Sequence, residues 1–367
     1  MIRMSPSTLL VYEFFTGGGC LGKDIPADLA VEALGMLWAL LVDFRLWGEV
    51  RTIAAIDSRV EDRIPGLNRN TLPANQVIPI SEDCWNDPFS MLLECCDAAL
   101  IIAPETDDIL TSLTRQAEKA NIPVLGSCSA AVSIAGNKAS CYKVFQNKKL
   151  PLPPTQCLCF DSAADLLRQM SFPIVIKPID GAGSDGVCCI RGGDDIEDAL
   201  EHVRSATSHD QFLLQPFITG QHISVSVLST QNRCMPISLN EQLVETGARM
   251  KYHGSRVPLV DSSAPAAMEL ACSAVKSIQG LKGYVGVDLI LAEGSAQLIE
   301  INPRLTTSYV GLRQVCHLNL AEVIWNACMH GIMPERIQMS GQTIVKKDDF
   351  NTWGLSDWLT KKMVVQG

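Results

Sequence analysis

The chain has 367 residues, of which 47% are hydrophobic and 19% are charged, so it is long enough for two or three domains with cores of their own. Its formal net charge is −10 and it contains no long basic run, which argues against a nucleic acid or an anionic membrane as a partner. Small-molecule substrates are therefore expected.

No stretch has the pattern of a signal peptide or the length of a membrane span, because the apolar run in LGMLWALLVDF is broken at Asp43. The 14 cysteines show no C-x-x-C pair and no regular spacing that suits zinc or a disulfide framework. We therefore expect a cytoplasmic protein whose cysteines are mostly reduced and buried.

Residues 9–127 alternate between short strand patterns and helical patterns. Strands are predicted at 9–15, 52–57, 76–80, 98–104 and 123–126, and helices at 26–47 and 109–119. Such alternation is typical of a parallel sheet covered by helices, so residues 1–127 are predicted to form a Rossmann-like domain.

A glycine loop follows the first predicted strand, in the stretch EFFTGGGCLGKD. It satisfies the phosphate-binding patterns G-x-G-x-x-G and G-x-x-x-x-G-K, but Lys23 is followed by Asp24 instead of the Ser or Thr that holds magnesium. We interpret it as a close-approach loop beside Glu13 that faces a substrate rather than the nucleotide.

Acidic residues stand at the ends of several predicted strands, where open parallel sheets bind their ligands. For any one of these acids, a helix cap or a solvated loop charge is an equally weighted alternative. The candidate substrate residues are Glu13, Gly17, Gly18, Gly19, Glu105 and Thr106.

A proline cluster at 150–155 precedes a change of pattern to strands in hairpins with intervening helices, which predicts an antiparallel α+β region. We divide this part of the chain into a small lobe at 128–210, a large lobe at 211–335 and a C-terminal tail at 336–367. The tail shows little patterning, and one helix followed by irregular chain is expected there.

The segment GVDLILAEGSAQLIEINPRL predicts a hairpin whose strands carry Asp288, Glu300 and Asn302. Glu300 and Asn302 are two residues apart, so they share a face, and Asp288 on the partner strand can face them. Three converging oxygen donors suit a divalent cation such as Mg²⁺. The alternative is that Glu300 pairs with Arg304 or another base, or that the acids face solvent.

The segment IVIKPIDGAGSDGV predicts a buried strand carrying Lys177, followed by a glycine loop that can present backbone N–H groups to an anion. A lysine in an apolar strand needs a compensating charge, and a phosphate supplies one. A plain hairpin turn is the alternative. Lys138, before a predicted helix, and the segment from Gln215 to Ile218 are weak signals by themselves.

In this order, the segments resemble the ATP-grasp superfamily over about residues 9–330, most specifically in the E-I-N-P-R end and its partner acid. The resemblance implies a Rossmann-like domain followed by two α+β lobes that clasp ATP, with Mg²⁺, or alternatively Mn²⁺, as cofactor. It implies phosphate contacts from Lys138 and Lys177, a phosphate cover from Gly181, Gly183, Ser184 and Gly186, and an adenine site at Gln215, Phe217 and Ile218.

The resemblance further implies that Asp288, Glu300 and Asn302 hold the metal and that Arg304 lies beside the transferred phosphate or the carboxylate substrate. His222 stands where many members have a glutamate for the ribose. The loop with Arg249 and Lys251 is a candidate to close over the γ-phosphate.

The N-terminal half is similar to the tyramine–glutamate ligase group of methanofuran-type cofactor synthesis, in YEFFTGGG, in E-x-x-G-M-L-x-A-L-x-x-D-F over 32–44, in APET and in KYHGSRVPL. This implies a carboxylate–amine ligase with an acyl-phosphate intermediate and small-molecule acid and amine substrates. A homodimer is compatible with it. A carboxylase, a dipeptide ligase and a non-catalytic nucleotide-binding module are the competing interpretations.

Overall fold

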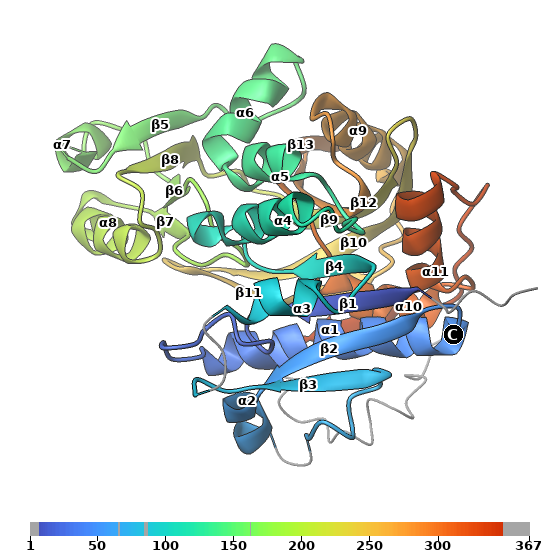
Figure 1. The fold of residues 1–367 in the computed structure, drawn as a ribbon. Coiled ribbons are helices and arrows are strands. Elements are labelled where there is room, and N and C mark those ends of the chain that lie inside the picture. Colours follow the sequence, from blue (N-terminus) through green and yellow to red (C-terminus); the bar gives the residue numbers. More distant parts are fainter. Residues whose placement is uncertain (1–6, 65–66, 84–86, 162, 348–367) are drawn as a thin grey trace, which may run out of the picture.

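The computed structural model describes residues 7–64, 67–83, 87–161 and 163–347, which form three sheets (Figure 1). The first sheet is parallel, with the strand order β3-β2-β1-β4. Its strands are β1 (Thr8–Glu13), β2 (Arg51–Asp57), β3 (Gln76–Ile80) and β4 (Ala98–Ile102). The helices between and after them are α1 (Ala27–Trp47), α2 (Ser58–Arg63), α3 (Pro88–Leu93) and α4 (Ile109–Lys119).

The central strands of this sheet are apolar on both faces, which fits burial between helices. The strand predicted at 123–126 is not formed as such. Val124 makes only an isolated parallel bridge with Ala99, because the chain passes the sheet edge briefly before turning into α5 (Ser129–Gly136).

The second sheet is antiparallel, with the order β5-β8-β6-β7. Its strands are β5 (Gln156–Cys159), β6 (Ile174–Pro178), β7 (Cys188–Ile190) and β8 (Gln211–Pro216), and the helices α7 (Ala163–Leu167) and α8 (Ile196–Ser205) pack on it. Because β8 pairs with both β5 and β6, the small lobe extends to residue 216, beyond the boundary at 210 drawn from the sequence.

The third sheet has six strands in the order β13-β12-β9-β10-β11-β14. They are β9 (Gln221–Ser229), β10 (Cys234–Thr246), β11 (Met250–Val257), β12 (Gly283–Ala292), β13 (Ser295–Asn302) and β14 (Thr343–Lys346). Apolar residues of one face form a core with α5, α6 (Lys138–Asn147) and α9 (Ala264–Ser277). The opposite face carries the polar residues that line the site.

The end of the described chain returns to the first domain. Helices α10 (Ser308–Val315) and α11 (Leu320–Trp325) lie beside α1 (Figure 1) and share its core, and a π-helical turn, η3 (Asn326–His330), follows. Asp43 of α1 accepts hydrogen bonds from Tyr309 (2.7 Å) and from Arg313 (2.7 and 2.9 Å). Asp43, which lies about twenty residues after the first glycine loop, thus joins two helices.

The first part of the predicted tail, 336–347, contains a strand that the sequence did not predict. This strand, β14, pairs with β11 through Thr343 to Lys346. The rest of the predicted tail, 348–367, lies outside the described residues. Within the described ranges, no helix has the length and apolarity needed to cross a membrane. The cysteines described are all unpaired, and Cys95, Cys128, Cys157 and Cys159 are exposed rather than buried.

Candidate functional site

The β12–β13 hairpin places the three predicted metal ligands together. Asp288 lies directly opposite Glu300 in the register, and the Asn302 amide donates to the Asp288 carboxylate at 3.1 Å. The turn at Glu293 and Gly294 has left-handed φ values of 50° and 77°, which closes the hairpin in this register. Burial and then the neighbouring Glu300 charge raise the pKa of Asp288 well above its ordinary value.

Two lysines from the small lobe face these acids. Lys138, at the start of α6, donates to the Gly181 carbonyl at 2.8 Å and lies 3.3 Å from the Glu300 carboxylate. Asn137 caps this helix by accepting from the Ser140 N–H at 2.9 Å, which fixes where Lys138 emerges. Of the alternatives for Glu300, pairing with a base other than Arg304 is therefore the one that the structure shows, since Arg304 pairs with Glu105.

Lys177 on β6 is only 4% exposed, and burial lowers its pKa to about 8, although Glu300 acts in the opposite direction. Burial would raise the pKa of Glu300, but Lys138 and Lys177 outweigh burial and lower it. The small and large lobes thus meet through opposite charges at this point.

The donor set fits a hard divalent cation. The two opposed carboxylates and the amide oxygen are hard oxygen ligands. Three ligands do not fill the octahedral coordination shell of Mg²⁺, which leaves positions for phosphate oxygens and water. Among the described residues no cluster of three or more His, Cys, Asp or Glu side chains offers another metal site.

The loop at 181–186 has the conformation expected of an anion-binding turn. Gly181, Gly183, Ser184 and Gly186 have left-handed φ values of 101°, 69°, 72° and 69°. Asp180, which the sequence reasoning missed, anchors the loop by accepting from the Asp107 N–H at 2.9 Å and the Thr207 hydroxyl at 2.6 Å.

Asp180 therefore ties the glycine loop to η1 (Thr106–Asp108), the segment that follows β4. A side chain at Gly181 would lie 3.7 Å from the Thr106 hydroxyl, so the two predicted sites are adjacent. The preceding residue, Glu105, accepts hydrogen bonds from Arg304 at 2.9 and 3.0 Å. Glu105, Thr106, the glycine loop and Arg304 are thus brought together.

Arg304 is surrounded by carboxylates. Burial alone would lower its pKa, but Glu105 first, and then Glu32 and Glu300, outweigh burial and raise it. Arg304 therefore keeps its charge in a buried position between the first domain and the metal hairpin.

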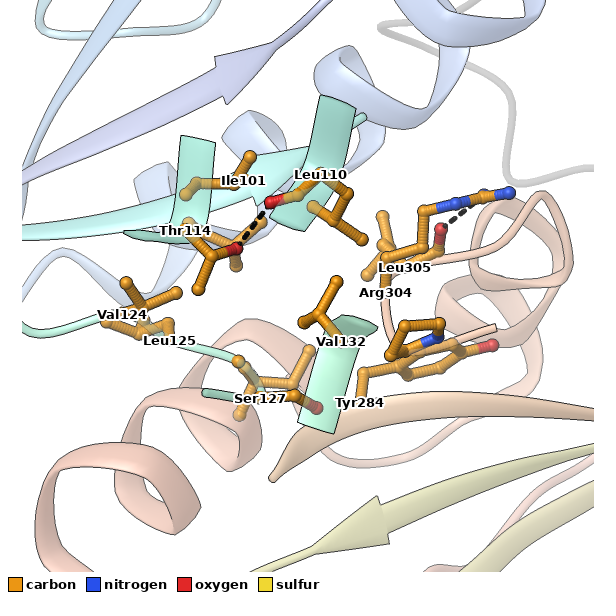
Figure 2. A pocket seen from close by; sticks show the side chains of 14 residues that line it. Ile101, Leu110, Thr114, Val124, Leu125, Ser127, Val132, Tyr284, Arg304 and Leu305 are labelled. Carbon is orange, nitrogen blue, oxygen red and sulfur yellow. Dashed lines mark hydrogen bonds between the residues drawn. The ribbon is translucent and has the colours of Figure 1, made fainter. Parts of the chain in front are cut away.

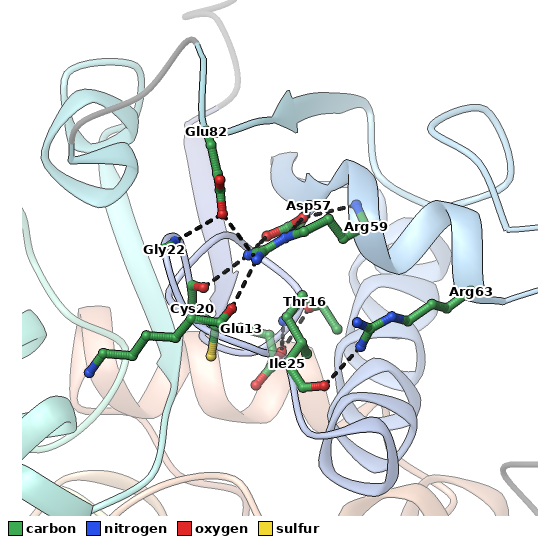
Figure 3. Close-up of polar contacts among 10 residues, drawn as sticks. Glu13, Thr16, Cys20, Gly22, Ile25, Asp57, Arg59, Arg63 and Glu82 are labelled. Atoms are coloured by element: carbon green, nitrogen blue, oxygen red, sulfur yellow. Dashed lines mark hydrogen bonds and ion pairs between the residues drawn. The ribbon is translucent and has the colours of Figure 1, made fainter.

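Glu13 ends β1 under the first glycine loop (Figure 3). Its carboxylate accepts from the Thr16 N–H and hydroxyl, both at 2.7 Å, and from the Phe15 N–H at 3.2 Å. Burial nevertheless raises the pKa of Glu13 to about 7, since it outweighs these hydrogen bonds and the charge of Arg304.

The first glycine loop is tightly packed. Added side chains at Gly17, Gly18 and Gly19 would meet the Glu13 carbonyl oxygen, Ile80 and the Phe14 ring at 2.5, 2.5 and 2.2 Å. These glycines permit close approach between parts of the chain itself, with no open phosphate cradle among them.

Arg59 holds this loop in place, as Figure 3 shows. Its guanidinium donates to the carbonyls of Cys20 and Lys23, both at 2.9 Å, and pairs with Asp57 at 2.8 Å. The same region contains Glu82, which accepts from the Gly22 N–H at 3.0 Å. Sequence reasoning had no signal for Arg59, since two of its contacts are backbone carbonyls of the loop, which carry no residue-type signature.

The predicted adenine residues lie where the chain passes from β8 to β9. The Gln215 amide donates to the Thr155 hydroxyl at 2.8 Å, and the Arg191 guanidinium lies 5.4 Å from the centre of the Phe217 ring. Ile218 follows in the connection, and His222, opposite Ile290 on β12, has its pKa lowered by burial. Within the described part of the chain, none of these side chains forms a hydrogen bond or an ion pair with Lys138, Lys177 or the acids of the β12–β13 hairpin.

Arg249 and Lys251 lie at the end of the β10–β11 hairpin that reaches the small lobe. The Met250 N–H donates to the Val187 carbonyl, and the Cys189 N–H to the Ala248 carbonyl, both at 2.9 Å. Arg249 thereby bridges to β7, directly after the glycine loop at 181–186.

A small cavity lies behind Arg304, between β4, α4 and α5 and lined also by Tyr284 (Figure 2). Its volume of about 20 Å³ has room for roughly one water molecule. It is far too small for a nucleotide or an amino acid.

Comparison with known proteins agrees with this arrangement. Residues 50–132 match the family model of the pre ATP-grasp 3 domain, and residues 135–308 match that of the ATP-grasp domain. The chain is 33% identical over 234 residues to the tyramine–L-glutamate ligase of Methanocaldococcus jannaschii, and 28% identical over 193 residues to a D-alanine–D-alanine ligase of Stutzerimonas stutzeri. These matches span 63% and 50% of the chain, and 62% and 60% of the relatives' length.

Among solved structures, an ATP-grasp superfamily protein from Archaeoglobus fulgidus has a TM-score of 0.66 and 25% identity, with 93% of this chain and 92% of that chain covered. A biotin carboxylase from Campylobacter jejuni, in complex with an ATP analogue, has a TM-score of 0.72 at 18% identity, covering 94% and 76%. The latter likeness shows the fold alone. With both halves of its described fold matched in order, the chain has the ATP-grasp fold, with a pre-ATP-grasp domain followed by an ATP-grasp domain.

Proposed function

We propose that the chain is an ATP-dependent carboxylate–amine ligase that joins the γ-carboxylate of L-glutamate to tyramine or tyrosine, in a methanofuran-type cofactor pathway in the cytoplasm. The observation that carries the proposal is the convergence of Asp288, Glu300 and Asn302 with Lys138 and Lys177. The similarity to a tyramine–L-glutamate ligase supports the choice of substrates.

In the proposed reaction, a substrate carboxylate oxygen attacks the γ-phosphorus of ATP, and ADP leaves. The amine nitrogen then attacks the acyl carbon, the phosphate leaves and the nitrogen loses a proton. Bound at Asp288, Glu300 and Asn302, Mg²⁺ would supply charge neutralisation at the phosphate oxygens. The lysines hold the phosphate charges, and the loop at 181–186 offers backbone N–H groups and excludes water.

Two acids at the strand ends, Glu13 and Glu105, are candidates to accept the proton of the amine or to hold the amine as an ammonium, and their contacts differ. Glu105 is held by two nitrogens of the buried Arg304 guanidinium, so accepting a proton would break this ion pair. The Glu13 carboxylate accepts three hydrogen bonds but forms no ion pair among the described residues, and burial raises its pKa to about 7, which suits exchange of a proton near neutral pH. We assign the proton acceptor role to Glu13 and the positioning of Arg304 to Glu105.

A product assay tests the proposal. Protein, ATP and Mg²⁺ should release ADP and phosphate only when L-glutamate and tyramine are both present, and mass spectrometry should detect the glutamyl amide. Asp288→Asn should abolish ADP release, whereas Asp210→Asn, the same change at an exposed carboxylate, should not.

Other outcomes would assign another activity. ADP release that requires bicarbonate indicates a carboxylase, release with two amino acids and no amine indicates a dipeptide ligase, and nucleotide binding without turnover indicates a non-catalytic module. Unchanged turnover after replacing both Arg249 and Lys251 with Ala would remove the proposed closing role of their hairpin.

A further inference from the structure

A second acidic position, Glu32, lies close to Arg304. Glu32 is on the first half of α1 and belongs to the E-x-x-G-M-L-x-A-L-x-x-D-F stretch, whose other acid, Asp43, only joins α1 to α10. The proposed function gives Glu32 no role, and its side chain is only 13% exposed.

The loop after β13 links Glu32 to the site. Arg304 in this loop pairs with Glu105, and Thr307, three residues later, donates a hydrogen bond from its hydroxyl to Glu32. The same loop thus holds one carboxylate from the segment after β4 and a second one from α1. Burial lowers the pKa of the Arg304 guanidinium, and Glu32 is near enough to help Glu105 raise it.

An aromatic ring completes the surroundings of Glu32. Tyr252 on β11 is held by its hydroxyl, which lies 2.6 Å from the Ser255 hydroxyl. The ammonium of Lys347 lies 2.8 Å from the Glu32 carboxylate and 5.5 Å from the centre of the Tyr252 ring. A carboxylate and an aromatic face around one ammonium are the elements of a cation-binding site.

Lys347 is the last residue that the structure describes, and its side chain is 25% exposed, so water reaches the pair. An ammonium held by one partly exposed lysine can exchange for an ammonium from solution at modest cost. The Glu32 carboxylate is more buried than Lys347, so leaving it without any cation partner would cost more than exchanging one ammonium for another.

From these contacts we propose that Glu32 and Tyr252, with Thr307, form a binding site for the primary ammonium group of a substrate, and that Lys347 occupies it in the free protein. This rests on the proposed function for the presence of an ammonium-bearing substrate. Both the α-ammonium of L-glutamate and the amine of tyramine have the required chemistry, and the experiment separates them.

The test measures binding with matched ligand pairs, in the presence of a non-hydrolysable ATP analogue and Mg²⁺. L-glutamate is compared with glutarate, and tyramine with tyrosol, since each second member lacks only the ammonium. Wild-type protein should prefer one ammonium-bearing ligand over its partner by about ten-fold or more, and that pair identifies the source.

Glu32→Gln should remove most of this preference while the affinity for the ATP analogue stays unchanged. Lys347→Met should tighten binding of the same ligand several-fold, because it removes the internal competitor. Glu49→Gln and Lys276→Met are the matched controls, with the same charge changes just beyond the end of α1 and in the last turn of α9, and they should leave the preference intact.

Equal binding of both ligand pairs to wild-type protein and Glu32→Gln would overturn the ammonium site, even if the enzyme forms the amide. Weaker binding after Lys347→Met would also overturn it, because the pair would then be a structural bridge. Ammonium-selective binding without any ADP release would instead keep the site and reject the proposed ligase reaction. Melting temperatures of the variants show whether loss of binding reflects loss of fold.

Discussion

The Arg304–Glu105 pair offers the sharpest energetic prediction. The two side chains are 12% and 3% exposed and are joined by two contacts of 2.9 and 3.0 Å. Removing one member of such a pair leaves an uncompensated buried charge and costs about 3–5 kcal/mol. Glu105→Ala should therefore lower the free energy of unfolding by about 3–5 kcal/mol, and Glu105→Gln, which keeps an acceptor but loses the charge, by about 2 kcal/mol.

The same pair predicts strong non-additivity. Replacing both partners by apolar side chains of similar volume is often nearly neutral, so Glu105→Leu with Arg304→Met should lie within about 1 kcal/mol of the wild type. Each single change should be costly, which gives a coupling energy of about 2–4 kcal/mol. Activity should be lost in the double variant, because Arg304 is expected beside the transferred phosphate or the carboxylate substrate.

Urea unfolding followed by tryptophan fluorescence and by circular dichroism measures these values. Agreement of the two probes is required, because a chain with several domains need not unfold in one step. The exposed pair Arg168–Asp165 is the control, and its removal should change stability by less than about 0.5 kcal/mol. Single effects of Glu105 and Arg304 that simply add in the double variant would refute the reasoning.

Three further predictions concern the site and its support. If Glu13 accepts the amine proton, kcat/KM should fall as the pH drops through about 7, because burial raises the pKa of Glu13 and protonation removes the acceptor; Glu13→Gln should remove this limb of the pH–rate profile. Lys23→Ala should leave the affinity for ATP nearly unchanged, whereas Lys177→Met should weaken it about ten-fold or more in equilibrium dialysis; the reverse order would return the nucleotide to the first glycine loop. Asp43→Asn should lower the midpoint of thermal unfolding by leaving Arg313 without its charge partner, yet keep ATP affinity; lost ATP affinity in a stable variant would contradict its structural role.

Local pattern was sufficient for much of the fold. Period-two alternation and the turn at Glu293 and Gly294 predict the β12–β13 hairpin, and its pairing brings Asp288 opposite Glu300 as expected. The alternation of strands and helices likewise predicts the parallel sheet, whose four strands are confirmed. These features depend on neighbours that are close in sequence.

Other features depend on partners far apart in the chain. β8 was assigned to the large lobe because nothing in its sequence states that it pairs with β5 and β6. β14 has only four residues, and its pairing with β11 is a long-range contact without a local signal. The roles of Asp180 and Arg59 were missed for the same reason, since each acts on a loop that folding brings to it.

The sequence by itself determined the order of the two domains, the residue types that can hold phosphate and metal, and the positions of the glycine loops. Only the tertiary structure decided which charges compensate one another: Glu300 faces Lys138, Glu105 holds Arg304, and Glu32 holds Lys347. A buried charge requires a partner because desolvation is costly, but that partner is chosen by packing between elements up to hundreds of residues apart. The identity of each pair is therefore a property of the fold.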